Sequence, residues 1–490
     1  TDLVQRRTGE HRNPAVQGPR REQPHRNGQP DNGDPPPARP VRERTRLAAR
    51  ASRYAKVGAS MGGVAARMAG AKLAGGGPAA NAMALTAALG GLKGPLMKVA
   101  QLLATIPDLL PPEYAAELQK LQSEAPPMGA AFVKRRMMAE LGAGWREKFG
   151  AFDLRPAGAA SLGQVHRADD PQGRPLACKL QYPDGASAGE AALRQRDLLC
   201  GSRRPLDGGS DTAEIKHEIA ARVREELDYR REARHAALYR DMLADCPDIR
   251  VPATRGDLTT TRLLTMDWLA GEKVLAFRNA PQEVRDAIGY ALFRAWWRPF
   301  LRHGVIHGDP HLGNYSVFRG EDGKPAGVNL YDFGCIRIFP PRFVAGVVEL
   351  YRGLLENARA RIVGAYRDWG FRGLSDELIE VMNVWARFIY APILDDRVRS
   401  VADGVAPGEY GRREAFQVHR ALKERGPVTV PQEFVFMDRA AVGLGAVFLH
   451  LDAKLNFHRI FEEALEGFSV EALDQRQAAA LARAGLPRPA

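Results

Sequence analysis

Hydrophobic and polar positions divide the 490-residue chain into segments with different periods. Residues 1–40 contain almost no large apolar side chains and are rich in Pro, Arg, Gly, Asn and Gln, so we expect a disordered basic tail. Apolar residues recur at helical spacing within residues 41–130, with breaks near Gly75 and Pro111. This pattern predicts a helical extension ahead of the main fold, followed by an amphipathic helix at Phe132–Leu141.

The pattern then changes to short strands, which mark a domain at residues 131–270. Three runs predict antiparallel strands, and a fourth predicts a strand before a hinge at residues 267–271: Ala151–Leu154, Gln164–Ala168, Leu176–Gln181 and Arg262–Met266. One long charged segment with a single apolar stripe, Ala213–Ala244, predicts a continuous helix inserted among these strands.

Residues 271–470 predict a helical domain that contains one β-hairpin. The strand-like runs Tyr315–Phe318 and Val328–Tyr331 are joined by the turn-rich segment Arg319–Gly327. Residues 471–490 are rich in alanine, and we expect a C-terminal tail there. The fold class predicted from these elements is α+β.

Composition and charge narrow the function classes. Residues 1–50 hold eleven Arg against six Asp and Glu, so the tail accounts for +5 of the net charge of +12. The remainder is a mild bias that suits acidic phospholipid or nucleotide, and no nucleic-acid partner is predicted. Four cysteines without a C-x-x-C pair argue against disulfides and zinc. A polar amino terminus and an interrupted apolar run at Leu73–Leu92 indicate a cytoplasmic protein without a membrane span.

The strongest chemical signal is the segment His307–Asn314, followed eighteen residues later by Asp332-Phe333-Gly334. Phosphoryl transfer in kinases needs an Asp near the attacking oxygen, an Asn five residues later for one Mg²⁺ ion, and a further Asp for metal beside the phosphates. Asp309, Asn314 and Asp332 have this spacing, so we assign Asp309 to catalysis and the other two to metal binding. The predicted hairpin brings Asn314 and Asp332 to the same end of two paired strands.

An alternative interpretation concerns three histidines spaced four residues apart, His303, His307 and His311. They could form a metal cluster or cap a helix. Gly308 and Pro310 break the helix that would place them on one face, which disfavours this reading.

Small residues between the first two predicted strands suggest a phosphate-binding loop. Small side chains allow backbone N–H groups to approach phosphate closely. The candidate nucleotide-binding residues here are Gly158, Ala159, Ala160, Ser161, Gly163 and Gln164. At the hinge, main-chain groups near Met266 and Trp268 are candidates for binding the adenine edge.

Lys179 is a single charge within an apolar strand. Such a lysine either extends to solvent or pairs with phosphate and a helix carboxylate, and the downstream motifs favour the second reading. Glu226, Asp228 and Glu232 are the candidate carboxylates, and the residues alone leave the choice among them open.

In this order the motifs resemble the UbiB/AarF (ADCK-type) atypical kinase family, which is linked to coenzyme Q (ubiquinone) biosynthesis. The resemblance covers roughly Pro40 to Gly467. Lys98–Gln101 is similar to the family's K-x-G-Q helix, with Ala100 in place of Gly, and Gly158–His166 is similar to its alanine-rich nucleotide loop, with Gly158 in place of the first Ala. Glu226 and Asp228 match its E-x-D motif, and Glu232 matches the next Glu of the same helix. The resemblance therefore favours Glu232 as the partner of Lys179, with Glu226 left open.

The resemblance implies a two-lobed protein-kinase-like fold with a helical N-terminal extension that blocks protein substrates. Lys98 and Gln101, a solvated helix edge when taken alone, would then lie over the site. It also implies ATP (or ADP) and Mg²⁺ as cofactors, and lipid or quinone precursors as partners. Two further possibilities are left open: peripheral binding of the protein to the inner face of an anionic membrane, and formation of a homodimer.

Two rival interpretations remain. A small-molecule phosphotransferase of the aminoglycoside or choline kinase type shares the H-G-D-x-x-x-x-N and D-x-G patterns but does not need Lys98, Gln101 or the E-x-D pair. A nucleotide-binding scaffold without activity usually lacks the lysine or an aspartate, and this chain has both.

Overall fold

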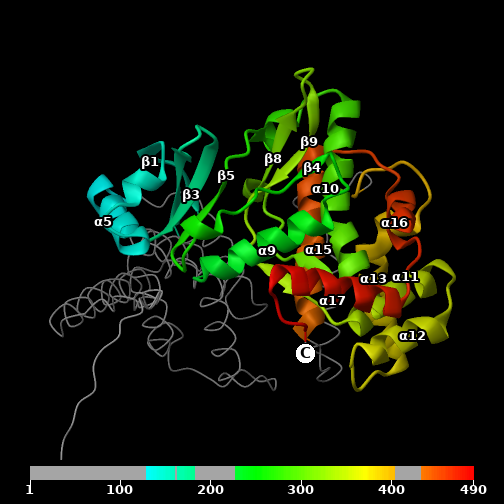
Figure 1. The fold of residues 1–490 in the computed structure, drawn as a ribbon. Coiled ribbons are helices and arrows are strands. Elements are labelled where there is room, and N and C mark those ends of the chain that lie inside the picture. The colour runs from blue at the N-terminus through cyan, green and yellow to red at the C-terminus, as the bar shows by residue number, and fades with distance from the viewer. Residues whose placement is uncertain (1–127, 161–162, 183–226, 403–431, 490) are drawn as a thin grey trace, which may run out of the picture. The chain divides into compact units, whose positions relative to one another are not determined.

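The computed structural model describes residues 128–160, 163–182, 227–402 and 432–489. Its N-terminal lobe contains a four-stranded antiparallel sheet in the order β1-β2-β3-β5 (Figure 1). The strands are β1 (Ala151–Ala160), β2 (Gly163–Asp169), β3 (Pro175–Gln181) and β5 (Leu263–Asp267). The antiparallel strands expected from the sequence are therefore confirmed.

Helix α5 (Ala130–Leu141) and the 3₁₀ turn η2 (Trp145–Lys148) pack beside this sheet. Val133 and Met137 of α5 are fully buried with Leu176 and Leu180 of β3. The predicted amphipathic helix at Phe132–Leu141 is thus confirmed, with its apolar face against the sheet.

Strand β1 is longer than its sequence predicts. It continues through Pro156 to Ala160, so most of the expected phosphate-binding loop is strand. The register shifts between Phe152 and Pro156 and again between Pro156 and Gly158. Because β1 is an edge strand, Pro156 can lie in an irregular stretch of it without removing a bond from the sheet interior.

Helix α9 (Tyr229–Met242) starts later than the long helix predicted at Ala213–Ala244. Leu227 and Asp228 are not helical, so the prediction of one continuous helix is wrong there. Asp228 is the N-cap: its carboxylate accepts hydrogen bonds from the backbone N–H groups of Arg230 (3.0 Å) and Arg231 (3.4 Å). A capping Asp competes with helix continuation through its own position.

The C-terminal lobe is mostly helical and contains the predicted hairpin. Its helices are α10 (Gln282–His303), α11 (Pro341–Leu355), α12 (Arg359–Asp368), α13 (Asp376–Leu394), α15 (Gln432–Leu451), α16 (Phe457–Leu465) and α17 (Val470–Ala484). Its short strands are β4 (Ile249–Arg250), β6 (Glu272–Lys273), β7 (Val305–His307), β8 (Tyr315–Arg319), β9 (Pro325–Leu330) and β10 (Ile336–Ile338). Further 3₁₀ turns are η3 (Gly256–Leu258), η4 (Val274–Phe277) and η5 (Leu312–Asn314).

The hairpin β8–β9 belongs to a sheet of order β4-β9-β8-β6, and β7 pairs with β10 in a separate two-stranded sheet. Tyr315 opposes Leu330, so Asn314 and Tyr331 lie next to each other at the end of the hairpin. The predicted hairpin is therefore confirmed, and it places Asn314 beside Tyr331, the residue before Asp332.

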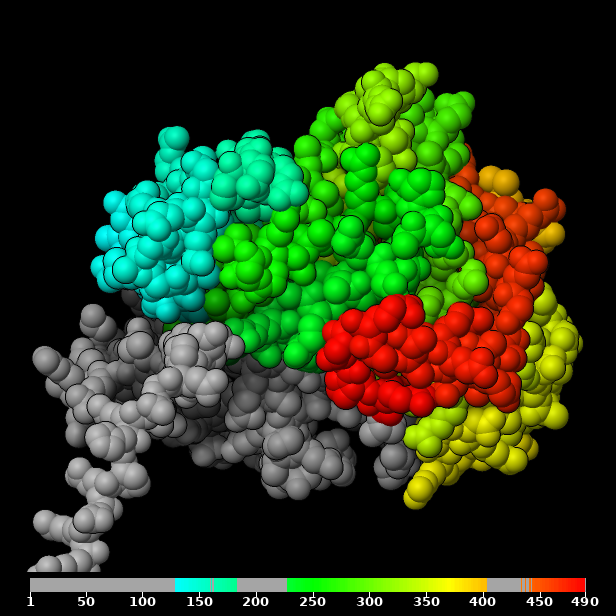
Figure 2. Space-filling view, viewed as in Figure 1, coloured from blue at the N-terminus to red at the C-terminus, as the bar shows by residue number. Residues whose placement is uncertain are grey.

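The expected tail at residues 471–490 is instead largely helix. Helix α17 is capped by Ser469, whose hydroxyl accepts from Ala472 N (3.1 Å), and by Gly485 in the left-handed conformation. Gln477 is fully buried, and its amide donates to the carbonyls of His303 and Phe339, both at 2.8 Å. The buried face of α17 consists of Leu473, Gln477, Ala480 and Leu481, and the helix packs against α9 and α10. Figure 2 shows the adjoining red and green surfaces.

In the ranges that the structure describes, every helix is too short or too polar to traverse a bilayer.

Candidate functional site

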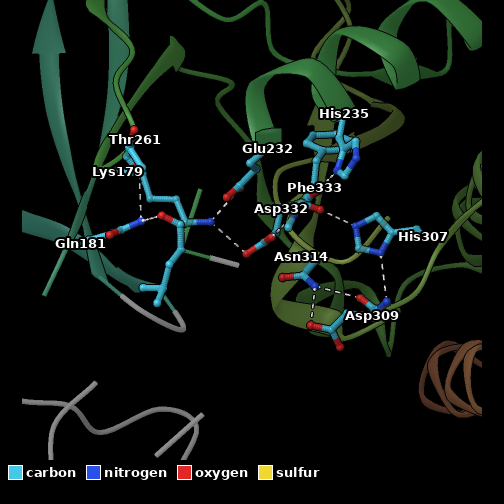
Figure 3. Close-up of polar contacts among 12 residues, drawn as sticks. Lys179, Gln181, Glu232, His235, Thr261, His307, Asp309, Asn314, Asp332 and Phe333 are labelled. Atoms are coloured by element: carbon cyan, nitrogen blue, oxygen red, sulfur yellow. Dashed lines mark hydrogen bonds and ion pairs between the residues drawn. The ribbon is translucent and has the colours of Figure 1, made fainter. Parts of the chain in front are cut away.

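Lys179 is the centre of the candidate active site. Its Nζ lies 2.7 Å from Glu232 Oε1 and 3.2 Å from Asp332 Oδ2 (Figure 3). Lys179 is 5% exposed and Glu232 is 3% exposed, so their ion pair is shielded from water. Lys179 thus joins strand β3 to helix α9 through Glu232, and to the turn after β9 through Asp332. Glu232 is the carboxylate that the sequence analysis favours.

The position of Glu232 follows from how α9 begins. Asp228 caps the helix, and Glu232 lies in the first turn. Gln181, two residues after Lys179 and thus on the same face of β3, donates from Nε2 to the carbonyls of Leu227 (2.7 Å) and Thr261 (3.2 Å). Sequence reasoning missed Gln181; its position two residues from Lys179 in a strand was the available signal.

The charges at this centre are unequal, because two carboxylates share one ammonium. Burial raises the pKa of Glu232 to about 7, although Lys179 opposes the shift. Burial alone would lower the pKa of Lys179, but Asp332 and Glu232 outweigh it and hold that pKa well above its usual value. Two carboxylates beside one ammonium form an acidic site, and such a site suits a divalent cation.

The catalytic loop is held by His307, the last residue of β7. Its Nδ1 accepts from the backbone N–H of Asp309 (3.3 Å), and its Nε2 hydrogen-bonds to the carbonyl of Asp332. These partners imply the tautomer with hydrogen on Nε2. The imidazole therefore connects the loop of Asp309 to the turn of Asp332.

Asn314 completes this half of the site. Its Nδ2 donates to the carbonyl of Asp309 (2.8 Å) and lies 3.3 Å from Asp309 Oδ2. Asp332 accepts at Oδ1 from the N–H of Gly334 (2.9 Å). Figure 3 shows the side chains of Asp309, Asn314 and Asp332 gathered beside one another, as their spacing predicted. Carboxylate and amide oxygens are ligands that Mg²⁺ prefers, so this donor set fits the metal.

The small-residue segment contributes differently from the prediction. A Cβ on Gly163 would lie 2.0 Å from the carbonyl oxygen of Leu180, so close strand pairing requires glycine here. Gln164 is buried: its Nε2 lies 2.7 Å from His166 Nε2, and its Oε1 accepts from Met128 N at 2.8 Å. The Gln164 side chain therefore holds the lobe interior together, and nucleotide binding by the backbone of this segment stays a prediction.

Ala159 and Ala160 end strand β1, where Ala160 pairs with Gly163. At Gly158 a Cβ would meet nothing within 4 Å. At the hinge, Met266 pairs with Ala177 of β3, and the N–H of Trp268 donates to the carbonyl of Pro175 (3.0 Å). That N–H is thus already used within the lobe, and adenine binding near Met266 and Trp268 stays a prediction.

Four predicted site residues, Lys98, Gln101, Ser161 and Glu226, lie outside the described residues. The alternative of a histidine metal cluster gains no support. Over the described ranges, no three His, Cys, Asp or Glu side chains gather as a metal site would require. His303 ends α10, His307 ends β7, and His311 caps η5 through Gly313 N.

A family model described as "ABC1 atypical kinase-like domain" matches residues 120–366, half of the chain. The chain is 30% identical over 281 residues to "Protein ACTIVITY OF BC1 COMPLEX KINASE 8, chloroplastic" of Arabidopsis thaliana, covering 56% of this chain and 36% of that protein. It is 30% identical over 271 residues to "Atypical kinase COQ8, mitochondrial" of Saccharomyces cerevisiae, covering 55% and 52%. The chain thus spans between a third and about half of these relatives' lengths.

Among solved structures, the chain is similar to Rv3197 of Mycobacterium tuberculosis, solved as a complex with erythromycin. The match has a TM-score of 0.55 and 28% identity, and covers 77% of this chain and 93% of that one. The α+β kinase-like fold and the family resemblance expected from the sequence are confirmed. With the geometry of Lys179, Asp309 and Asp332 and the family match, this chain belongs to the ABC1 atypical kinase-like family.

Proposed function

We propose that the protein binds Mg-ATP (or ADP) and transfers the terminal phosphoryl group of ATP, with ATP hydrolysis as its basic reaction. The observation that carries this proposal is the contact of Lys179 with both Glu232 and Asp332. In protein kinases the strand lysine, its helix glutamate and the metal-binding aspartate must all be in place for activity. Here the three side chains already meet.

Each group has a distinct role in this proposal. Asp309 accepts the proton of the attacking hydroxyl or water, and Lys179 binds the phosphates. Asn314 and Asp332 would hold Mg²⁺, which neutralises charge on the phosphate oxygens. His307 keeps the two loops together through its bonds to Asp309 N and the Asp332 carbonyl.

The biological setting follows from the family resemblance. We propose that ATP turnover supports isoprenoid-quinone (ubiquinone) biosynthesis by acting on lipid or quinone precursors at an anionic membrane surface. The extension at 41–130, with Lys98 and Gln101, would block protein substrates, with Glu226 and Asp228 as its partners. The mild positive charge of the chain supports peripheral attraction to acidic lipid.

The test is ATP turnover by the purified protein, with and without anionic liposomes and a quinone-precursor phenol. We expect turnover that rises with liposomes and falls about 10²- to 10⁴-fold in Asp309→Asn. Asp322→Asn, an exposed residue in the β8–β9 turn, is the matched control and should keep wild-type turnover. Absence of turnover by the wild type under all conditions would refute the enzymatic proposal; phosphorylation of a soluble alcohol would favour a small-molecule phosphotransferase.

A further inference from the structure

Three polar side chains lie beneath the hinge: Ser316, Asn329 and Tyr331, which we call the hinge clasp. The hydroxyl of Tyr331 donates to the carbonyl of Leu269 (3.0 Å) and hydrogen-bonds with Ser316 Oγ. Asn329 Nδ2 donates to Ala270 O (3.0 Å) and to Ser316 Oγ (2.9 Å), and lies 3.3 Å from the Tyr331 hydroxyl. The clasp therefore binds two successive hinge carbonyls.

Two members of the clasp are shielded from water, and the third, Tyr331, is half-buried. Asn329 is fully buried and Ser316 is 5% exposed. They oppose each other in the β8–β9 register, so both project from one face of the hairpin. A Cβ on Gly271 would lie 2.1 Å from Ser316 Oγ, so the hinge backbone rests directly on the clasp. Leu269 is half-buried and Ala270 is exposed, so the group that pays a desolvation cost on losing its acceptor is the buried amide of Asn329.

Tyr331 also contacts the metal-binding half of the site through its main chain. Its N–H donates to the carbonyl of Asn314 (3.1 Å), and the next residue is Asp332. Tyr331 thus hydrogen-bonds to the hinge through its hydroxyl and to Asn314 through its backbone N–H, and it is joined to Asp332 by a peptide bond.

We propose that Tyr331 is a positioning residue that couples the hinge to the metal-binding residues Asn314 and Asp332. Because the clasp holds residues 269–271 against the β8–β9 hairpin, these residues move together with it. Any rotation of one lobe relative to the other then takes place on the N-terminal side of Leu269. A base bound at the hinge and a metal held by Asp332 are then kept at a constant separation. This inference rests on the proposed nucleotide function and adds a determinant of its geometry.

The experiment compares wild type with Tyr331→Phe, which keeps the ring and removes the hydroxyl. Hydrogen exchange of residues 267–273 is measured first, without nucleotide. The affinity for ADP is then measured with and without Mg²⁺. We expect faster hinge exchange in the variant, and we expect the factor by which Mg²⁺ strengthens ADP binding to fall about fivefold, the effect of one hydrogen bond.

Tyr351→Phe is the matched control, because its hydroxyl bonds to Glu462 within the helical lobe. It should leave both readouts unchanged even if it lowers stability. Ser316→Ala provides a second clasp variant should Tyr331→Phe fold poorly, with the same direction of change. Unchanged hinge exchange in the clasp variants would overturn the clasp, and faster exchange with an unchanged Mg²⁺ factor would overturn the coupling. A wild type that binds no ADP would instead refute the proposed function, while hinge exchange still tests the clasp.

Discussion

The two halves of the candidate site differ in how they are held. Lys179 and Glu232 lie in regular elements, β3 and α9, and are almost entirely buried. Asp309 and Asn314 lie on short turns between β7 and β8 and are half-exposed. The buried half therefore affects both the stability of the fold and the charge of the site. The half-exposed residues can contact a substrate, and substitutions there should leave the fold intact.

Asp332 is where the two halves meet. Its Oδ2 contacts Lys179, while its main-chain carbonyl hydrogen-bonds with His307. The comparison predicts that substitutions in the buried half alter stability and nucleotide binding together. Substitutions at Asp309 should alter turnover alone.

The largest expected effect is that of Lys179→Ala. The variant leaves Glu232 buried without its cation, and breaking a buried ion pair costs roughly 3–5 kcal/mol. We expect that loss in the free energy of unfolding, measured by urea titration, together with loss of nucleotide binding. Lys148→Ala, an exposed lysine of the same lobe, should change the unfolding free energy by less than about 0.5 kcal/mol. A Lys179→Ala protein as stable as the wild type would show that the buried half does not support the fold.

The next effect concerns pH. The pKa of Glu232 is raised from 4.5 to about 7 in the folded protein. Between these values the folded state retains a proton that the unfolded state has lost, so the free energy of unfolding falls as pH rises through this range. Urea unfolding at pH 5 and pH 7.5 should show this loss in the wild type and not in Glu232→Gln. Parallel losses in the two proteins would assign the pH dependence to other groups.

The smallest effect separates two glycines of the predicted phosphate loop. A Cβ at Gly158 meets nothing within 4 Å, so Gly158→Ala should stabilise the protein by about 0.4–1 kcal/mol through lower entropy of the unfolded chain. Gly163→Ala is the matched contrast and should destabilise, because its Cβ would strike Leu180 O. Thermal denaturation of both variants measures the difference; equal shifts would mean that strand pairing does not constrain Gly163.

Local patterns predicted part of the geometry of the candidate site. The hairpin between Asn314 and Asp332 predicted that these two residues lie at the same end of two paired strands, and the structure shows them there. The single charge in an apolar strand predicted that Lys179 pairs with a carboxylate of the later helix, and the family's E-x-D motif then favoured Glu232, which is the observed partner.

Other features depended on contacts that no local pattern encodes. Helix α17 was missed because an Ala-rich segment has no strong apolar stripe. Its buried polar residue, Gln477, donates to the carbonyls of His303 and Phe339, which are far away in sequence. The burial of the Gln164 side chain against His166 and Met128 depends on tertiary packing, so its neighbours in sequence did not indicate it. The hinge clasp joins residues about sixty positions apart in sequence, so Tyr331 reads only as part of a strand.

The most direct test of the account is a thermal-shift titration of wild type and Asp332→Asn with Mg-ATP, beside ATP alone. If Asp332 connects the two halves and holds the metal, Mg-ATP should stabilise the wild type, by about 2.7 kcal/mol at a hundredfold excess over Kd. Asp332→Asn should lose the Mg²⁺-dependent part of that stabilisation, because the amide lacks the charge. An unchanged Mg²⁺-dependent stabilisation in Asp332→Asn would contradict the account and remove Asp332 from the metal site.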